Sequence, residues 1–313
     1  ETPFFREFWI ETPEPGADRI IFHALLDGEA ATGAYRFELR PGVDSTLDVK
    51  LTLFARKTGV KLSFAPIISM FHHGEGDRRA KTDFKPEAHD SDGLLINAST
   101  GEWLWRPLRN PAQTEVSAFM GKDARGFGLM QRDRNFDHYQ DLELGYERRP
   151  SLWVEPVGDW GEGHVELIEA PGADEGAKNI MASWVPAAQP ELGKPFSLAY
   201  RITATQDLER LSPAGRAVSA FTAPAKGAHR VLIDFAGGEL PFFLTDAPAI
   251  EVVATASQGK IVRSFVTPNP FTKGLRATVD LALEPGQTAD LRVALRNGPR
   301  ILTETWTTPF RAE

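Results

Sequence analysis

Hydrophobic and polar residues alternate along much of this chain with a period of two, which is typical of β-strands. The clearest case surrounds a Pro41-Gly42 turn, where every second residue is apolar: Tyr35, Phe37 and Leu39 before it, and Leu47, Val49, Leu51 and Leu53 after it. Proline followed by glycine marks a turn. The pattern therefore predicts a long antiparallel hairpin over residues 33–54.

Other segments in the first two thirds of the chain predict further strands. Residues 4–10 form one, and residues 20–26 are almost continuously apolar, which indicates a strand buried on both faces. Shorter strands are predicted over residues 94–98, 103–107, 126–132, 151–157, 164–169, 180–184 and 196–202. Long connections rich in Gly, Pro, Asn and Asp separate the middle strands, and such loops on a β-scaffold are commonly functional. Helices are expected only as short turns, for example around residues 207–211.

The character of the sequence changes after residue 219. Short alternating strands are predicted at residues 230–235, 250–254, 260–266, 275–283, 290–295 and 302–307. This succession of short strands and turns indicates an immunoglobulin-like sandwich. We therefore expect an all-β protein with a first domain over residues 1–205, a linker over 206–219 and an immunoglobulin-like domain over 220–313.

Length, composition and charge narrow the functional classes. The chain has 313 residues, 42% hydrophobic and 25% charged, as in a globular protein with two domains. Its net charge of -8 argues against nucleic acid and anionic membranes as partners and favours a neutral ligand. There is no cysteine, so disulfides and thiolate chemistry are excluded. Because the chain starts at Glu1 and its first methionine is Met70, we expect that a leader or an N-terminal portion precedes it.

Residues 89–179 are unusually rich in Asp, Arg and Trp, a mixture that suits a carbohydrate cleft. The segment opens with His89-Asp90-Ser91-Asp92-Gly93, which by itself is also an ordinary turn whose Asp side chains cap backbone amides. A strand with Trp103 and Trp105 on one face follows, and Arg106 comes next. Such a Trp pair belongs to a core more often than to a sugar platform, so both interpretations stay open.

Two carboxyl groups flanking a glycosidic bond are the minimum for its hydrolysis. The residues offer Asp90 or Asp92 for one role and Asp174 or Glu175 for the other, and composition does not choose among them. Asp133, Asp137 and Asp141 are read mainly as a solvated loop or helical turn, whereas Tyr146 and Arg149 could orient a substrate. No metal or cofactor is expected. The adjacent His72 and His73 would point to opposite faces of a strand, so an exposed polar loop is the better interpretation.

Several longer motifs, in order along the whole chain, resemble one family. They are Phe-Arg-Glu-Phe-Trp (5–9), Ala-Leu-Leu-Asp (24–27), Thr-Gly-Ala-Tyr (32–35), His-Asp-Ser-Asp-Gly-Leu (89–94), Gly-Glu-Trp-Leu-Trp-Arg-Pro-Leu (101–108), Gly-Phe-Gly-Leu (126–129), Arg-Pro-Ser-Leu-Trp-Val (149–154) and Thr-Glu-Thr-Trp (303–306). These motifs are similar to those of the bacterial periplasmic glucan biosynthesis proteins, the G and D proteins of osmoregulated periplasmic glucan synthesis.

The resemblance implies a large antiparallel β-sandwich domain with a cleft, joined by a short helical link to an immunoglobulin-like domain. It implies residence in the periplasm and action on β-1,2-glucan, as an inverting endo-glucanase or as a transglycosylase, with the membrane glucan synthase as a candidate partner. By the same resemblance Asp90 matches the general base, Tyr146 and Arg149 lie near the scissile bond, and Glu175 matches the Glu of an Asp-Glu loop. The remaining residues predicted to bind substrate are His89, Asp92, Trp103, Trp105, Arg106 and Trp153.

One position departs from the family pattern. Where the resemblance places the general acid, an Asp directly before Asn-Ile, this chain has Lys178. Lysine, with an unperturbed pKa of ~10.4, is a poor proton donor to a glycosidic oxygen at neutral pH. Two hypotheses follow: an enzyme of altered acid chemistry, with Asp90 as base and Glu175 as the first substitute acid, or a non-catalytic glucan-binding or scaffold protein. The sequence does not indicate an oligomeric state.

Overall fold

A computed structural model describes residues 4–75, 84–206, 211–245 and 249–312 of the chain. It is almost entirely β-structure in antiparallel sheets, which confirms the predicted all-β class. The chain divides into two compact units. The first unit comprises residues 1–72, 85–100 and 108–208, and the second comprises 73–84, 101–107 and 209–313.

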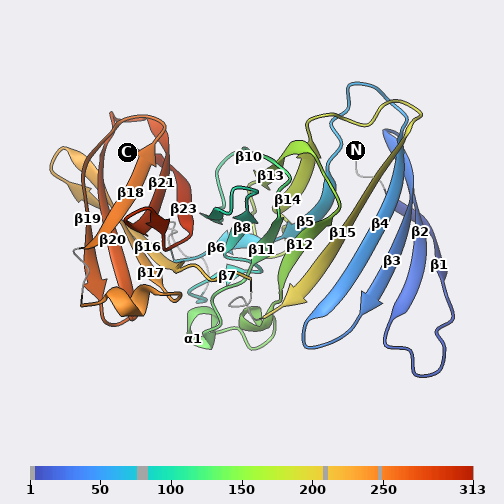
Figure 1. Cartoon of the computed structure of the whole chain (residues 1–313), viewed down its shortest axis with the longest axis horizontal. Helices are drawn as coiled ribbons and strands as arrows, with labels where there is room; N and C mark the ends of the chain where they lie inside the picture. Colours follow the sequence, from blue (N-terminus) through green and yellow to red (C-terminus); the bar gives the residue numbers. More distant parts are fainter. Residues whose placement is uncertain (1–3, 76–83, 207–210, 246–248, 313) are drawn as a thin grey trace. The chain divides into compact units, whose positions relative to one another are not determined.

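The larger sheet of the first unit has eight strands, and each pairs antiparallel with the next (Figure 1). In spatial order they are β1 (Phe4–Ile10), β2 (Ile20–Asp27), β3 (Ala31–Arg40), β4 (Ser45–Ala55), β15 (Pro195–Thr205), β12 (Ser151–Val157), β11 (Gly126–Met130) and β8 (Gly93–Asn97). The predicted hairpin over residues 33–54 is β3–β4, and Val49, Leu51 and Leu53 are buried on one face as the alternation requires.

A second, smaller sheet faces part of the first. It consists of β10 (Glu115–Lys122), β13 (Glu162–Glu169), β14 (Ile180–Pro186) and β5 (Phe64–Ser69), all antiparallel. Rings of the two sheets contact each other, because Phe64 of β5 lies 4.9 Å from Phe196 of β15, and Trp160 lies between Trp184 of β14 and Tyr200 of β15. The core of the first unit is therefore a sandwich whose two inner faces interlock through aromatic side chains.

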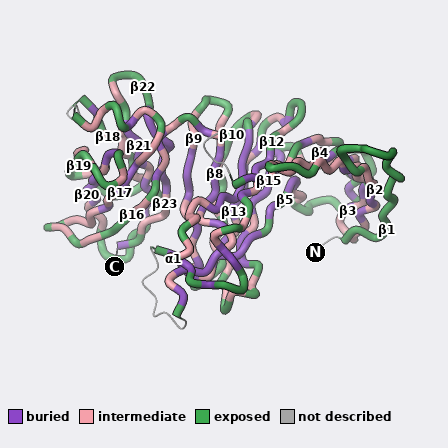
Figure 2. The backbone as a smooth tube through the Cα atoms, turned by 90° about the horizontal axis from the view of Figure 1, so that it is seen from below, coloured by how far each residue is buried: buried purple, intermediate pink, exposed green. Residues whose placement is uncertain are grey.

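The outer end of the large sheet is uncovered. Every residue of β1 is exposed, and in β2 only Ala24 and Leu26 are buried (Figure 2). The prediction that residues 20–26 form a strand buried on both faces is therefore wrong for this chain. The physical reason is position: β2 lies beside the edge strand β1, beyond the part of the sheet that the smaller sheet covers.

The second unit is a smaller sandwich. One sheet contains β16 (Arg216–Ala225), β17 (Ala228–Ala236), β20 (Gly274–Ala282) and β19 (Lys260–Asn269). The other contains β9 (Trp103–Pro107), β23 (Thr305–Arg311), β21 (Thr288–Asn297) and β18 (Ile250–Ala256), with β22 (Arg300–Ile301) beside β21. Alternating residues of β17, β20 and β21 are fully buried, as their pattern predicts: Val231, Ile233, Phe235, Leu275, Ala277, Val279, Leu281, Leu291, Val293 and Leu295.

Some elements differ from the sequence predictions. β5 and β10 were not predicted, and β16 begins inside the stretch interpreted as a linker. The helix expected around residues 207–211 falls largely on residues 207–210, outside those described; the described helical segments are α1 (Phe136–Tyr139), η1 (Tyr146–Arg148) and η2 (Leu240–Phe243). His72 and His73 lie in a strand, β6 (Phe71–His73), where His73 is buried, so the exposed-loop interpretation is wrong for them. In the described parts of the chain, no helix is long and apolar enough to cross a bilayer.

Candidate functional site

Asp90 follows the short strand β7 (Ala88–His89) and is the acceptor for two cations. Lys178 Nζ donates to Asp90 Oδ2 at 2.9 Å, and Arg149 Nε lies 3.3 Å from Asp90 Oδ1. The side chain of Asp90 is 17% exposed, whereas those of Arg149 and Lys178 are 41% and 58% exposed. One carboxylate thus lies under two cations whose outer surfaces face solvent.

A second group of contacts surrounds Glu175, which lies in the same loop as Lys178. The hydroxyl of Tyr146 donates to Glu175 Oε2 at 2.8 Å, and Lys85 Nζ lies 2.5 Å from Glu175 Oε1. The same lysine donates to Asp141 Oδ2 at 3.2 Å. Burial, and secondly the hydrogen bond to Glu175, raise the pKa of Tyr146, so its hydroxyl stays protonated and remains a donor.

The two groups meet at Tyr146. Its ring lies beneath the guanidinium of Arg149, at 5.9 Å, while its hydroxyl binds Glu175. Tyr146 is itself buried, in a cluster with Met70, Ala88 and Tyr139. The structure therefore brings together Asp90, Tyr146, Arg149, Glu175 and Lys178, five residues singled out from the sequence.

Side chain to backbone hydrogen bonds hold the loops of this site. Asn179 fixes the end of the Lys178 loop: its Oδ1 accepts from the backbone N–H of Phe71, and its Nδ2 donates to the carbonyls of Phe71 and Ala170. Arg134 holds the Arg149 loop, because its Nη1 donates to the carbonyls of Glu147 and Arg149. Both cations that contact Asp90 are thus carried by braced backbone.

His89 lies beneath the site, fully buried between two carboxylates. Its Nε2 lies 2.9 Å from Glu87 Oε2 and 3.6 Å from Asp92 Oδ1. Its Nδ1 contacts Gln131 Oε1 at 3.0 Å, and Gln131 uses its amide nitrogen as a donor to Tyr139, Tyr146 and the carbonyl of His89. Gln131 Oε1 must therefore accept a hydrogen bond from the protonated Nδ1 of His89.

The protonation of His89 follows from this arrangement. Burial lowers the pKa of His89, but the charge of Asp92 and the hydrogen bond and charge of Glu87 outweigh it, so the pKa is raised above its ordinary value. The ligand atoms of Glu87, His89 and Asp92 lie within 4.8 Å of one another, a spacing that a metal ion could also occupy. The raised pKa favours a proton on the ring, whose positive charge offsets those of the two carboxylates.

The side chain of Asp92 binds backbone N–H groups. Its Oδ2 accepts from the backbone N–H groups of Arg132 and Asp133, which belong to a distant loop rather than to the turn of the His-Asp-Ser-Asp motif itself. Of the wider Asp series, Asp133 pairs with His138 beside α1, and the buried Asp141 pairs with Lys85. His89 and Asp92 therefore support the loop that carries Asp90.

The other predicted substrate-binding residues lie in strands. Trp103, Trp105 and Arg106 belong to β9 in the second unit; Trp103 is half-buried, while Trp105 and Arg106 are buried, and Arg106 Nη1 donates to Thr308 Oγ1. Trp153 is buried in β12 against Gly126, where any Cβ would lie 2.3 Å from its ring. Trp105, Arg106 and Trp153 are thus core residues in this structure.

Three residues of the site escaped the sequence analysis: Lys85, Arg134 and Gln131. Lys85 and Arg134 are charged residues in loops, and no local pattern distinguishes them from solvated charges. Gln131 follows β11 directly, and its complete burial is visible only once the loops are folded around it.

The sequence of this chain is similar to those of known proteins. The family model of the periplasmic glucan biosynthesis protein MdoG matches residues 1–310. The chain is 42% identical to glucans biosynthesis protein G of Pseudomonas paraeruginosa, covering 100% of this chain and 62% of the relative. It is also 42% identical to glucans biosynthesis protein G of Sodalis glossinidius and to the probable glucans biosynthesis protein D of Shewanella oneidensis, covering 98% of this chain and 61% and 58% of those proteins. The chain thus spans about three fifths of the length of these relatives, and it belongs to the MdoG family of periplasmic glucan biosynthesis proteins.

Proposed function

We propose that this protein binds β-1,2-glucan in the periplasm, at the exposed side chains around Asp90, and does not cleave it. The observation that carries the proposal is the 2.9 Å ion pair between Lys178 and Asp90. An inverting glycosidase needs a carboxylic acid that protonates the leaving oxygen and a carboxylate that activates water. By the resemblance of the motifs, an amine, Lys178, stands where the family has its acid, and Asp90, which matches the base, lies beside two cations.

Glu175 is a poor replacement for the missing acid. Both of its oxygens have partners, since Tyr146 donates to one and Lys85 lies 2.5 Å from the other. A proton donor to a glycosidic oxygen would have to give up one of these contacts. This geometry reverses the order of the two hypotheses from the sequence and favours the binding protein.

The same side chains suit a role in binding sugar. Lys178 and Arg149 are exposed and carry several N–H donors, which is the complement that hydroxyl groups and ring oxygens need. The family name supports glucan as the ligand class. The β-1,2 linkage, the periplasmic location and the membrane glucan synthase as a partner rest on the resemblance of the sequence motifs.

A glucanase or transglycosylase is the second candidate, because Asp90 occupies the position of the base beside Arg149 and Tyr146. In that case the acid must be another group of the same loop. Asp174, which is exposed and accepts from the backbone N–H of Gly176, would be the first to replace.

Product analysis of linear β-1,2-glucan, combined with calorimetric titration, tests the proposal. The native protein should bind the glucan and release no new products, and Lys178→Asp, which restores a carboxyl group, should gain cleavage. Asp90→Asn in the Lys178→Asp background should abolish that cleavage. Shortened or cyclised products from the native protein that disappear in Asp90→Asn would instead establish the enzyme.

A further inference from the structure

Lys178 and Arg149 retain donors that no residue uses. Within the described residues, the only hydrogen bond of the Lys178 ammonium is to Asp90, so two of its three N–H groups are available. Arg149 Nε lies 3.3 Å from Asp90 Oδ1 without forming a hydrogen bond, and the guanidinium lies over the Tyr146 ring. No described residue hydrogen-bonds its two Nη groups. A guanidinium with both terminal nitrogens free can bind a carboxylate or phosphate group in a bidentate manner.

The two cations that contact Asp90 are more exposed than Asp90 itself. Two cations share one carboxylate, and the cations are 41% and 58% exposed against 17% for Asp90. The neighbouring carboxylates of Glu175 and Asp141 are 20% and 7% exposed and are paired with Lys85. Asp174 accepts a hydrogen bond from the backbone of its own loop. A ligand that approaches Asp90 therefore first meets Lys178 and Arg149, on a chain whose net charge is -8.

A neutral glucan uses the N–H donors of Lys178 and Arg149 but gains nothing from their charge. Hydroxyl groups need hydrogen-bond donors, and uncharged amides or hydroxyls supply them with less desolvation than an ammonium and a guanidinium. An anionic group gains from both cations through charge-assisted hydrogen bonds, which are about twice as strong as neutral ones. The identity of the two side chains thus points to a charged substituent.

We propose that Lys178 and Arg149 form a subsite for an anionic substituent on the bound glucan, a carboxylate or a phosphate ester. This inference rests on the proposed function, because it concerns a glucan bound at the same site. The anion would bridge the free N–H groups of Lys178 and the Nη groups of Arg149, while Asp90 keeps the two cations in place. The protein would then select decorated glucan chains over plain ones.

Calorimetric titration with three linear β-1,2-glucans of one length tests the selection: an unsubstituted chain, a chain with one carboxylate-bearing ester and a chain with one phosphate ester. We expect the charged chains to bind about tenfold more tightly than the neutral one at low salt. That preference should shrink as ionic strength rises to about 0.3 M, because exposed charges are screened. The two charged chains together distinguish a carboxylate site from a phosphate site.

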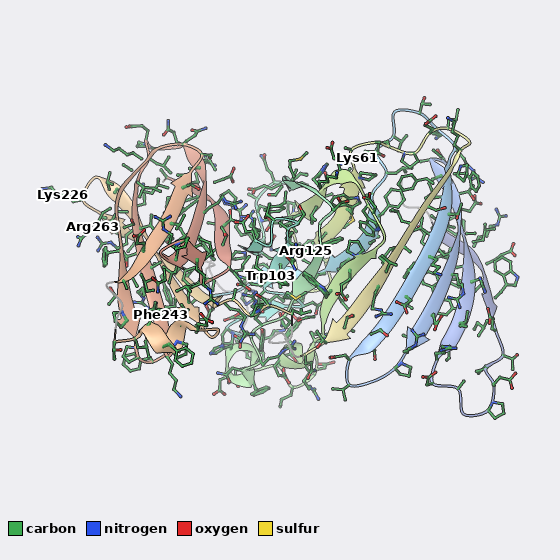
Figure 3. The ribbon with its side chains drawn as sticks, viewed as in Figure 1. Lys61, Trp103, Arg125, Lys226, Phe243 and Arg263 are labelled. Carbon is green, nitrogen blue, oxygen red and sulfur yellow. The ribbon has the colours of Figure 1, made fainter. Side chains whose placement is uncertain are left out.

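Substitutions test whether Lys178 and Arg149 cause the preference for charged glucans. Lys178→Met and Arg149→Met should each remove most of the tenfold preference, whereas Lys178→Arg should keep it. Lys57→Met is the matched control, because Lys57 lies in the same unit, is 51% exposed and pairs with Glu29 at 2.7 Å. Lys226→Met removes one positive charge from the β16–β17 turn of the second unit and controls for net charge (Figure 3). Both controls should retain the preference.

The outcomes separate the two proposals. Equal affinity for all three glucans, or a preference that survives in both Met variants, would overturn the anion subsite and leave glucan binding intact. Failure of every glucan to bind the native protein would overturn the proposed function itself. Binding of free inorganic phosphate or succinate as tightly as the charged chains would show an anion site that is independent of glucan, against the proposal.

Discussion

Charged residues of this chain pair in two different ways, between opposed strand positions, as also for Arg201 and Asp48 in the first unit, and between loops. In the second unit, Arg230 faces Asp280 and Asp234 faces Arg276 at directly opposed positions of β17 and β20, and each guanidinium binds both oxygens of its carboxylate. Around Asp90 in the first unit, the partners come from separate loops. A pair fixed by strand register uses its donors internally and stabilises the sheet, whereas charges that converge from loops keep donors for a ligand.

Breaking a strand pair should have the largest effect on stability. Arg276→Met leaves the carboxylate of Asp234, 5% exposed, without its cation. Removal of one partner of a buried pair costs about 3–5 kcal/mol, and since the arginine is itself 36% exposed we expect about 2 kcal/mol here. Urea unfolding should show this loss while glucan affinity is unchanged. A loss of glucan affinity at full stability would remove the distinction between the two kinds of pair.

Removing a cation beside Asp90 should lower affinity for the ligand and leave stability almost unchanged. In Arg149→Met the backbone stays held by Arg134, which binds the carbonyl of residue 149 rather than its side chain. We expect affinity for an anionic glucan to fall about tenfold, or about 1.4 kcal/mol, with little change in the urea midpoint. Titration and unfolding of the same preparation measure both. A large loss of stability would mean that this arginine is structural, like those of β17 and β20.

A pH titration sharpens the comparison within the first unit. The raised pKa of His89, set by Asp92 and Glu87 against the effect of burial, means that the native state favours the protonated ring. This contribution to stability is fully present below the unfolded pKa of ~6.5 and is lost as the pH rises through the higher native value. The urea midpoint should therefore fall over this range in the native protein and less steeply in His89→Gln. Parallel profiles would show that the ring does not titrate.

The smallest effect is expected at an exposed ion pair outside the Asp90 cluster. Lys57 pairs with Glu29, whose side chain is 77% exposed. Exposed ion pairs contribute little to stability because solvent screens them, so Lys57→Met should change the urea midpoint by an amount near the error of measurement and leave glucan affinity unaltered. A clear effect on affinity would extend the binding surface beyond the Asp90 cluster.

The sequence predicted strands where burial is one-sided and regular. β3, β4, β20 and β21 follow the alternation closely. β10 was missed because apolar residues such as Val116 and Met120 lie on its exposed face, which erases the contrast between the faces. β9 was predicted as a strand, but its parallel partner β23 lies some two hundred residues later, and no local pattern encodes that pairing.

The site was predictable only in part, for the same reason. Asp90, Tyr146, Arg149, Glu175 and Lys178 were identified through motifs, and the structure brings them together. Trp105, Arg106 and Trp153 were chosen for the chemistry of their side chains, which does not reveal that each is buried in a sheet. Lys85 and Arg134 depend on which loops meet, and this is set by tertiary packing rather than by any local pattern.

The hydrogen bonds of the Asn179 side chain bear on how fast a ligand can associate. β13 and β14 close the loop that carries Lys178 through the Glu169–Ile180 pair, and the Asn179 side chain then ties its base to Phe71 and Ala170. The backbone next to Lys178 has therefore already lost its conformational entropy on folding, and only side-chain torsions are left to order on binding. A ligand at this position should associate without waiting for loop closure, at a rate governed by diffusion and charge.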